Sequence, residues 1–175
     1  SGATEAINLG ILGLAGERST KRKQIITQRT EHSAVLACVE ILRQRGYDIT
    51  ILEVDADGRI DLNELEQALS DETLLVAIML ANNEIGTVQA VKAIGKICRA
   101  VGAIFFCDLT QGIGWHPVDV DQMNIDLAVL SAHKIYGPRG IGALFVRRKG
   151  AQTKLSPILV GGGQENGLRS GTANV

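Results

Sequence analysis

The chain reads Ser131-Ala132-His133-Lys134-Ile135-Tyr136-Gly137-Pro138-Arg139-Gly140-Ile141-Gly142-Ala143 over its most informative stretch. Apolar runs at 125–130 and 142–146 flank it, which predicts two buried strands joined by a polar, glycine-rich turn. In open α/β sheets, ligands bind beyond the carboxyl ends of strands, and that is where Lys134 stands. A lone lysine is more often a solvated surface charge. A lysine amine held in a dry site, however, can form a Schiff base with an aldehyde, and this context favours that second interpretation.

Composition narrows the class of protein. At 175 residues and 45% hydrophobic, the chain can bury one sizeable core. Its 18 basic and 19 acidic residues nearly cancel, so we expect neither a nucleic-acid nor a membrane partner. No signal peptide or bilayer-length apolar run is visible in the sequence. Three cysteines lack metal-ligand spacing and have apolar neighbours, which predicts no metal site and reduced, buried thiols in a cytoplasmic protein.

Helical and strand-like segments alternate along the rest of the chain. We expect helices over 1–15, 33–45, 61–69 and 90–101, and strands over 24–27, 49–54, 74–80, 103–107, 125–130 and 142–146. Basic stretches at 16–23 and 147–150 predict solvated loops. The Asp55-Ala56-Asp57-Gly58 turn resembles a calcium loop, but the later ligands of such a loop are missing. This alternation predicts an α/β fold, a three-layer α/β/α domain with a mostly parallel sheet.

Polar residues follow several of the predicted strands. His32 lies at a strand-to-helix turn, Asn83 follows 74–80, and Asp108 and Gln111 follow 103–107. Each has a structural alternative, since a histidine at such a turn is usually structural and Asp108 could cap a helix. An aspartate that ends an apolar strand is costly unless it is paired. The small residues around Thr4 open a helix, where free N–H groups either receive a phosphate or belong to an ordinary cap.

Taken together, these segments resemble the cysteine desulfurases of the class V aminotransferase group. Ser-x-His-Lys-x-x-Gly-Pro-x-Gly-x-Gly resembles the family's pyridoxal phosphate (PLP) lysine motif. Further similarities are Gly2-Ala3-Thr4-Glu5, Glu31-His32-x-Ala34-Val35, Asn82-Asn83-Glu84-x-Gly86, Asp108 with Gln111, and the segment 161–172. Leu109 and Thr110 depart from the small residues of the family pattern. The resemblance covers essentially residues 1–175, which are interpreted as a PLP-binding large domain truncated at both ends.

The resemblance implies a role for each matched residue. Lys134 and His32 would be catalytic, Lys134 as the Schiff-base lysine and His32 as the ring that stacks on PLP. Asp108 would keep the pyridine nitrogen protonated and Gln111 would bind the ring oxygen. The remaining cofactor contacts would be Asn83 near the substrate carboxylate, Ser131, His133 and Thr4 at the phosphate, and Thr172 at the phosphate of the other subunit.

The implied reaction removes sulfur from L-cysteine, leaving alanine and a persulfide for sulfur transfer or Fe–S cluster assembly. A protein sulfur acceptor and a homodimer would be the partners. The family's persulfide cysteine and its carboxylate-binding arginine fall beyond the matched residues. We therefore expect these residues alone to be inactive, with PLP held poorly. Two alternatives stay open, namely another class V PLP enzyme (a selenocysteine lyase or an aminotransferase) and a non-catalytic assembly domain.

Overall fold

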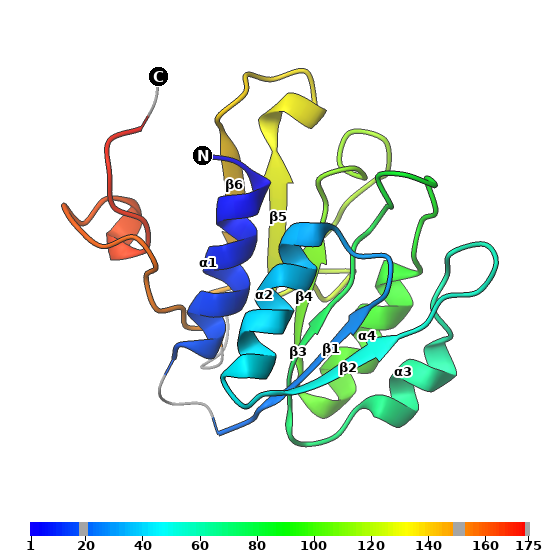
Figure 1. Cartoon of the computed structure of the whole chain (residues 1–175). Coiled ribbons are helices and arrows are strands. Elements are labelled where there is room, and N and C mark those ends of the chain that lie inside the picture. The colour runs from blue at the N-terminus through cyan, green and yellow to red at the C-terminus, as the bar shows by residue number, and fades with distance from the viewer. Residues whose placement is uncertain (18–20, 149–152, 174–175) are drawn as a thin grey trace.

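The computed structural model describes residues 1–17, 21–148 and 153–173, and in it a six-stranded sheet lies between two pairs of helices (Figure 1). The helices are α1 (Ala3–Ala15), α2 (Ser33–Gln44), α3 (Leu62–Ala68) and α4 (Val91–Val101). The strands are β1 (Gln24–Gln28), β2 (Asp48–Leu52), β3 (Thr73–Ala77), β4 (Ile104–Asp108), β5 (Leu127–Ser131) and β6 (Gly142–Val146). The predicted three-layer α/β/α fold is confirmed. Parts of the predicted loops at 16–23 and 147–150 lie outside the described ranges.

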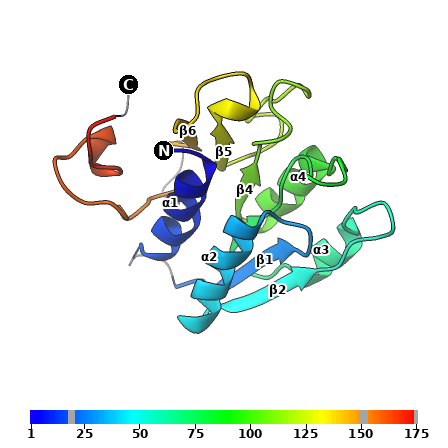
Figure 2. The same ribbon diagram turned by 45° about the horizontal axis from the view of Figure 1, so that its top comes forward.

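The strand order places the polar strand ends at one edge. The sheet runs β2-β1-β3-β4-β5-β6, and its neighbours are parallel except for β5 and β6. In that antiparallel pair Ser131 lies opposite Gly142, so the turn that carries Lys134 joins the end of β5 to the start of β6 (Figure 2). The carboxyl ends of β1, β3, β4 and β5 therefore face the same edge as this turn.

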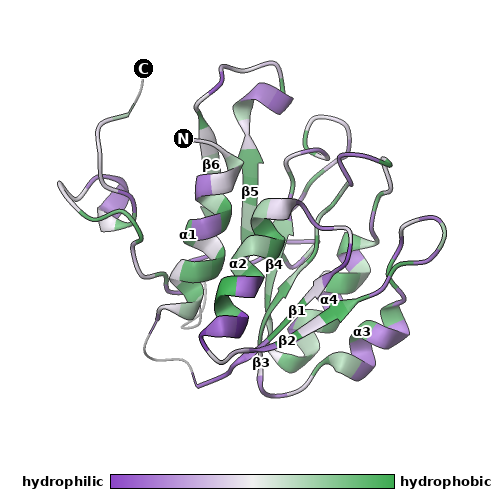
Figure 3. Cartoon of the chain, in the orientation of Figure 1, coloured by the Kyte–Doolittle hydropathy of each residue, from purple (hydrophilic) through white to green (hydrophobic). Residues whose placement is uncertain are grey.

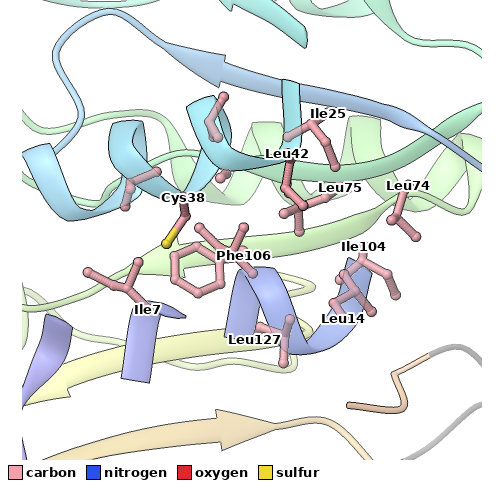
Figure 4. Close-up of a cluster of buried hydrophobic side chains, with 14 of the residues drawn as sticks. Ile7, Leu14, Ile25, Cys38, Leu42, Leu74, Leu75, Ile104, Phe106 and Leu127 are labelled. Carbon is pink, nitrogen blue, oxygen red and sulfur yellow. The ribbon is translucent and has the colours of Figure 1, made fainter. Parts of the chain in front are cut away.

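Two hydrophobic cores fill the space between the layers. Successive side chains of a strand point to opposite faces, and β4 shows this directly. Phe106 packs with Ile7, Cys38 and Leu42 on the face covered by α1 and α2 (Figure 4). Phe105 belongs to the other core, with α3 and α4. The ribbon coloured by hydropathy shows the same division, with apolar strands inside and polar helix faces outside (Figure 3).

Local hydrogen bonds agree with the predicted start of α3 and with the predicted turn at Asp55, whereas β2 and β3 end earlier than expected, at Leu52 and Ala77. The Asp61 carboxylate accepts the Asn63 N–H at 2.7 Å at the start of α3, as its N-cap position predicts. Asp55 closes its turn by accepting the N–H groups of Asp57 and Arg59, so the segment is a hydrogen-bonded turn. Within the described ranges, no helix combines the length and apolar character needed to cross a membrane.

One glycine contact brings the start of α1 to the sheet edge. A Cβ atom on Gly142 would lie 2.5 Å from the carbonyl carbon of Gly2, closer than any real contact. Glycine at the first residue of β6 therefore allows the chain around Gly2 to lie directly against the strand. This contact sets the amino end of α1 beside the end of β5.

Candidate active site

A cavity of about 550 Å³ opens at the edge of the sheet where the strand ends converge. This volume is typical of a small-molecule site. The structure brings together there all the predicted site residues except Thr172, namely Thr4, His32, Asn83, Asp108, Gln111, Ser131, His133 and Lys134. Thr172 is exposed and lies outside the cavity lining.

The amino end of α1 forms one wall. Gly2 is its N-cap residue and supplies no side-chain cap, so the first-turn N–H groups have no partner of that kind. Beside it, a Cβ atom on Gly2 would lie 3.9 Å from Ser131 Oγ, and Ser131 Oγ and His133 Nδ1 are 2.7 Å apart and share a hydrogen bond. Helix N–H groups, a hydroxyl and an imidazole make a donor-rich wall that suits an anion such as a phosphate.

His32 has both a structural and a cavity-facing position. Its Nδ1 accepts the Ala34 N–H at 3.1 Å, which caps α2. In the neutral imidazole this bond leaves the proton on Nε2. The ring also lines the cavity, so the structural interpretation and the site interpretation are compatible.

Asp108 is the acid of the site. It ends β4, is 5% exposed, and its Oδ1 accepts the Thr110 N–H at 2.8 Å. Burial raises the pKa of this carboxyl, while hydrogen bonding from Thr110 and the nearby His32 act in the opposite direction. A buried acid with a raised pKa is a group that gains from a cationic partner.

Lys134 is held by the turn that follows β5. It ends a short 3-10 segment, Ala132–Lys134, and its side chain is exposed to the cavity. The Ala132 carbonyl accepts the N–H groups of Ile135 and Gly137, at 3.0 and 2.8 Å. The Ala132 N–H in turn donates to the Ile141 carbonyl at 3.0 Å. These bonds fix the backbone from which the amine reaches the same cavity as Asp108 and Gln111.

Sequence reasoning missed several residues of the site. Arg139 lies in the lysine turn and lines the cavity, and its place in the Gly-Pro-Arg-Gly run was the available signal. Glu5 also lines the cavity and pairs with Arg169, whose guanidinium lowers the pKa of Glu5 to about 2. This pair joins the start of α1 to the segment 161–172. Because Glu5 and Arg169 are 164 positions apart, no local sequence pattern indicates that they pair.

The three cysteines lie away from the cavity. Burial raises the pKa of the Cys38 thiol to about 11 and that of Cys98 to about 12. The pKa of the Cys107 thiol is raised well above its ordinary value by burial and by the neighbouring carboxyls of Glu31 and Asp108. Cys107 packs in the core with α3 and α4, on the opposite side of β4 from the cavity-lining Asp108. The three thiols are thus buried, as expected, and none is in a disulfide.

Comparisons with known proteins agree on one family. The Aminotransferase class-V family model matches residues 1–174. The cysteine desulfurase IscS of Rickettsia massiliae (strain Mtu5) is 52% identical over 172 residues, which are 98% of this chain and 42% of the relative. The chain thus spans less than half the length of this curated relative.

Solved structures resemble the chain over almost its whole length. A NifS-like protein superposes with a TM-score of 0.93 at 38% identity, covering 99% of this chain and 47% of that one. A structure described as SspA in complex with cysteine gives a TM-score of 0.91 at 43% identity, covering 98% and 49%. The similarity therefore extends to the arrangement of the strand ends that build the cavity.

Proposed function

The chain belongs to the aminotransferase class-V family, and on that premise we propose that it forms the cofactor-binding part of a PLP-dependent cysteine desulfurase. The observation that carries the proposal is the single cavity that gathers a lysine amine, a buried carboxyl and an uncapped helix start. PLP carries an aldehyde, a pyridine nitrogen and a phosphate, which these three groups match in chemistry.

The donor set of the cavity fits PLP on each count. The Lys134 amine would bind the aldehyde carbon. Asp108 would bind the protonated pyridine nitrogen, and that cation would offset the burial that raises its pKa. The start of α1, with Ser131 and His133, would hold the phosphate. Gln111 and Asn83 supply amide groups at the same cavity.

When bound, PLP supplies an electron sink for the substrate's α-carbon. The side chains of this chain supply orientation and proton transfer. Asp108 would keep a proton at the pyridine nitrogen, and the hydrogen bond that its Oδ1 accepts from the Thr110 N–H holds the carboxyl in place. His32 would stack on the ring, with Nδ1 engaged by Ala34 and Nε2 free to exchange a proton. The Lys134 amine, which lines the same cavity, would accept and return a proton at the substrate's α-carbon.

L-cysteine is the proposed substrate, and alanine is the released product. The sulfur would pass to a protein acceptor or to Fe–S cluster assembly. The names of the similar proteins, including one described with cysteine, support this choice. We assign sulfur acceptance to a thiol other than Cys38, Cys98 or Cys107, because all three are buried with raised pKa values. Their free, reduced state also supports a cytoplasmic location.

A homodimer is part of the same proposal. Trp115 and Tyr136 are strongly exposed near the lysine turn, Tyr136 at 93%, and large exposed aromatics are enriched at interfaces. Thr172 is exposed away from the cavity of its own chain, which suits a contact with the cofactor of a second subunit.

The test is to incubate the protein that contains this chain with PLP, L-cysteine and a thiol reductant, and to measure sulfide and alanine. We expect both products in equal amounts, lost in Lys134→Ala and retained in Lys96→Ala, a matched change on the exposed face of α4. Alanine formed from L-selenocysteine alone would indicate a lyase instead. Failure to bind PLP at all would indicate a non-catalytic domain.

A further inference from the structure

A buried polar cluster lies beneath the cavity and has no part in the proposed function. It consists of Gln28 at the end of β1, Glu31 in the turn that follows, and Gln89 before α4, and all three are buried. Gln89 Nε2 donates to Gln28 Oε1 at 3.0 Å, and Gln28 Nε2 donates to Glu31 Oε1 at 2.9 Å. This chain of amides ends on the carboxyl of Glu31.

The two oxygens of Glu31 have different surroundings. Oε1 accepts the Met79 N–H at 2.6 Å as well as the Gln28 amide. Oε2 is fully buried and has no hydrogen-bond partner among the described residues. Met79 follows β3 and lines the cavity, so the carboxyl of Glu31 holds a piece of the cavity wall.

The charges around Glu31 are unfavourable to an anion. Its neighbours on β1 and before α4 are the neutral amides of Gln28 and Gln89, and Met79, which follows β3, contributes a backbone N–H. Titratable groups near it are Asp108 and Cys107 of β4, with His32 next in the chain. No cationic side chain binds Glu31 among the described residues. An ionised carboxyl here would be desolvated, bare on one oxygen and close to a second acid, all of which are costly.

We propose that Glu31 is a positioning residue that stays neutral in the folded protein, fixes the Met79 wall of the cavity, and leaves Asp108 as the carboxylate that serves the ligand. Two nearby carboxylates would otherwise raise each other's affinity for a proton, and Asp108 would be less able to pair with a cation. The last part of the inference rests on the proposed function, while the neutrality of Glu31 does not.

The electrostatics agree in direction with this geometry. Burial, followed by the nearby Asp108, raises the pKa of Glu31 to about 8, against the hydrogen bonds from Met79 and Gln28. Because the folded-state pKa lies above the unfolded value, the stability that neutral Glu31 provides is complete below about pH 4.5 and is lost as pH rises to about 8.

The test compares the pH dependence of unfolding of the cofactor-free protein with that of Glu31→Gln. Glutamine is isosteric, keeps the acceptor oxygen and cannot ionise. Between the two pKa values, the unfolding constant of the unsubstituted protein should rise about tenfold per pH unit relative to that of Glu31→Gln. Glu66→Gln, the same change at an exposed position of α3, keeps Glu31, so its curve should run parallel to that of the unsubstituted protein. Parallel curves for the unsubstituted protein and Glu31→Gln would overturn the proposal.

A second variant and a second measurement complete the test. Glu31→Leu removes the acceptor of the Met79 N–H, so it should be destabilised at every pH and bind PLP more weakly than Glu31→Gln. Equal behaviour of the two variants would overturn the positioning role. Carbon-13 NMR of the Glu31 carboxyl carbon in the unsubstituted protein should show a titration midpoint near 8, and a midpoint near 4.5 would contradict neutrality. Both stability and NMR are measured without PLP, so failure of the proposed function does not affect them.

Discussion

Replacing Asp108 with asparagine separates two effects that the cavity combines. The change is nearly isosteric, and the amide oxygen can still accept the Thr110 N–H that Asp108 Oδ1 accepts at 2.8 Å. The variant loses the negative charge of Asp108, a residue that is only 5% exposed, so that this charge is desolvated in the cofactor-free protein. The pKa of Asp108 is raised by that burial, so its ionised form costs stability at neutral pH. We therefore expect cofactor-free Asp108→Asn to be at least as stable as the unsubstituted protein.

The opposite result is expected for the cofactor. A hydrogen bond between charged groups contributes about 1.5–3 kcal/mol. Losing the pair between Asp108 and the pyridine nitrogen should raise the dissociation constant of PLP about ten- to hundredfold. Turnover should fall as well, because the nitrogen is no longer held protonated.

Two assays measure these effects. Urea unfolding of the cofactor-free protein reports stability, and a titration followed by the absorption of bound PLP reports affinity. Asp55→Asn is the matched control, since Asp55 also accepts backbone N–H groups in a turn and lies outside the cavity. A cofactor-free Asp108→Asn that is less stable, yet binds PLP with unchanged affinity, would refute the reasoning and leave Asp108 as a turn-closing residue.

Two further predictions concern the cysteines and the second subunit. At pH 8 the Cys38 thiol, with a pKa of about 11, is roughly one-thousandth ionised. Alkylation by iodoacetamide should therefore be far slower in the folded than in the urea-unfolded protein at all three cysteines, Cys38, Cys98 and Cys107. Rapid labelling of Cys107 in the folded protein would contradict the proposal that another thiol accepts the sulfur. Thr172→Val should weaken PLP retention about two- to tenfold by removing one hydrogen bond from a partner subunit. A fully active monomer in sedimentation experiments would exclude that role.

The strand ends were predictable from the sequence because apolar runs stop abruptly at polar residues. Asp108 ends the run 103–107 and Ser131 ends the run 125–130, and both fall in the last position of a strand. Strand alternation likewise sets the direction of Cys107, which points away from the cavity-facing Asp108 and into the core with α3 and α4. These features depend on local patterning, which a single sequence contains.

Other features depend on the tertiary fold. Glu31 lies between Thr30 and His32, and these polar neighbours in the sequence do not show whether its carboxyl is buried or exposed. It is buried because the turn after β1 folds under the end of β3, where Met79 meets its carboxyl. The pairing of Glu5 with Arg169 likewise joins distant segments. The antiparallel direction of β6 follows from the short lysine turn, which leaves no room for the crossover that a parallel strand requires.

The most direct test of the central claim is to find which lysine carries the cofactor. The protein is incubated with PLP, reduced with borohydride, digested, and examined by mass spectrometry for a phosphopyridoxyl group. We expect the label on the peptide that contains Lys134, and its loss in Lys134→Ala, since this amine shares the cavity with Asp108 and Gln111. A label confined to another lysine, or attachment that persists unchanged in Lys134→Ala, would contradict the assignment.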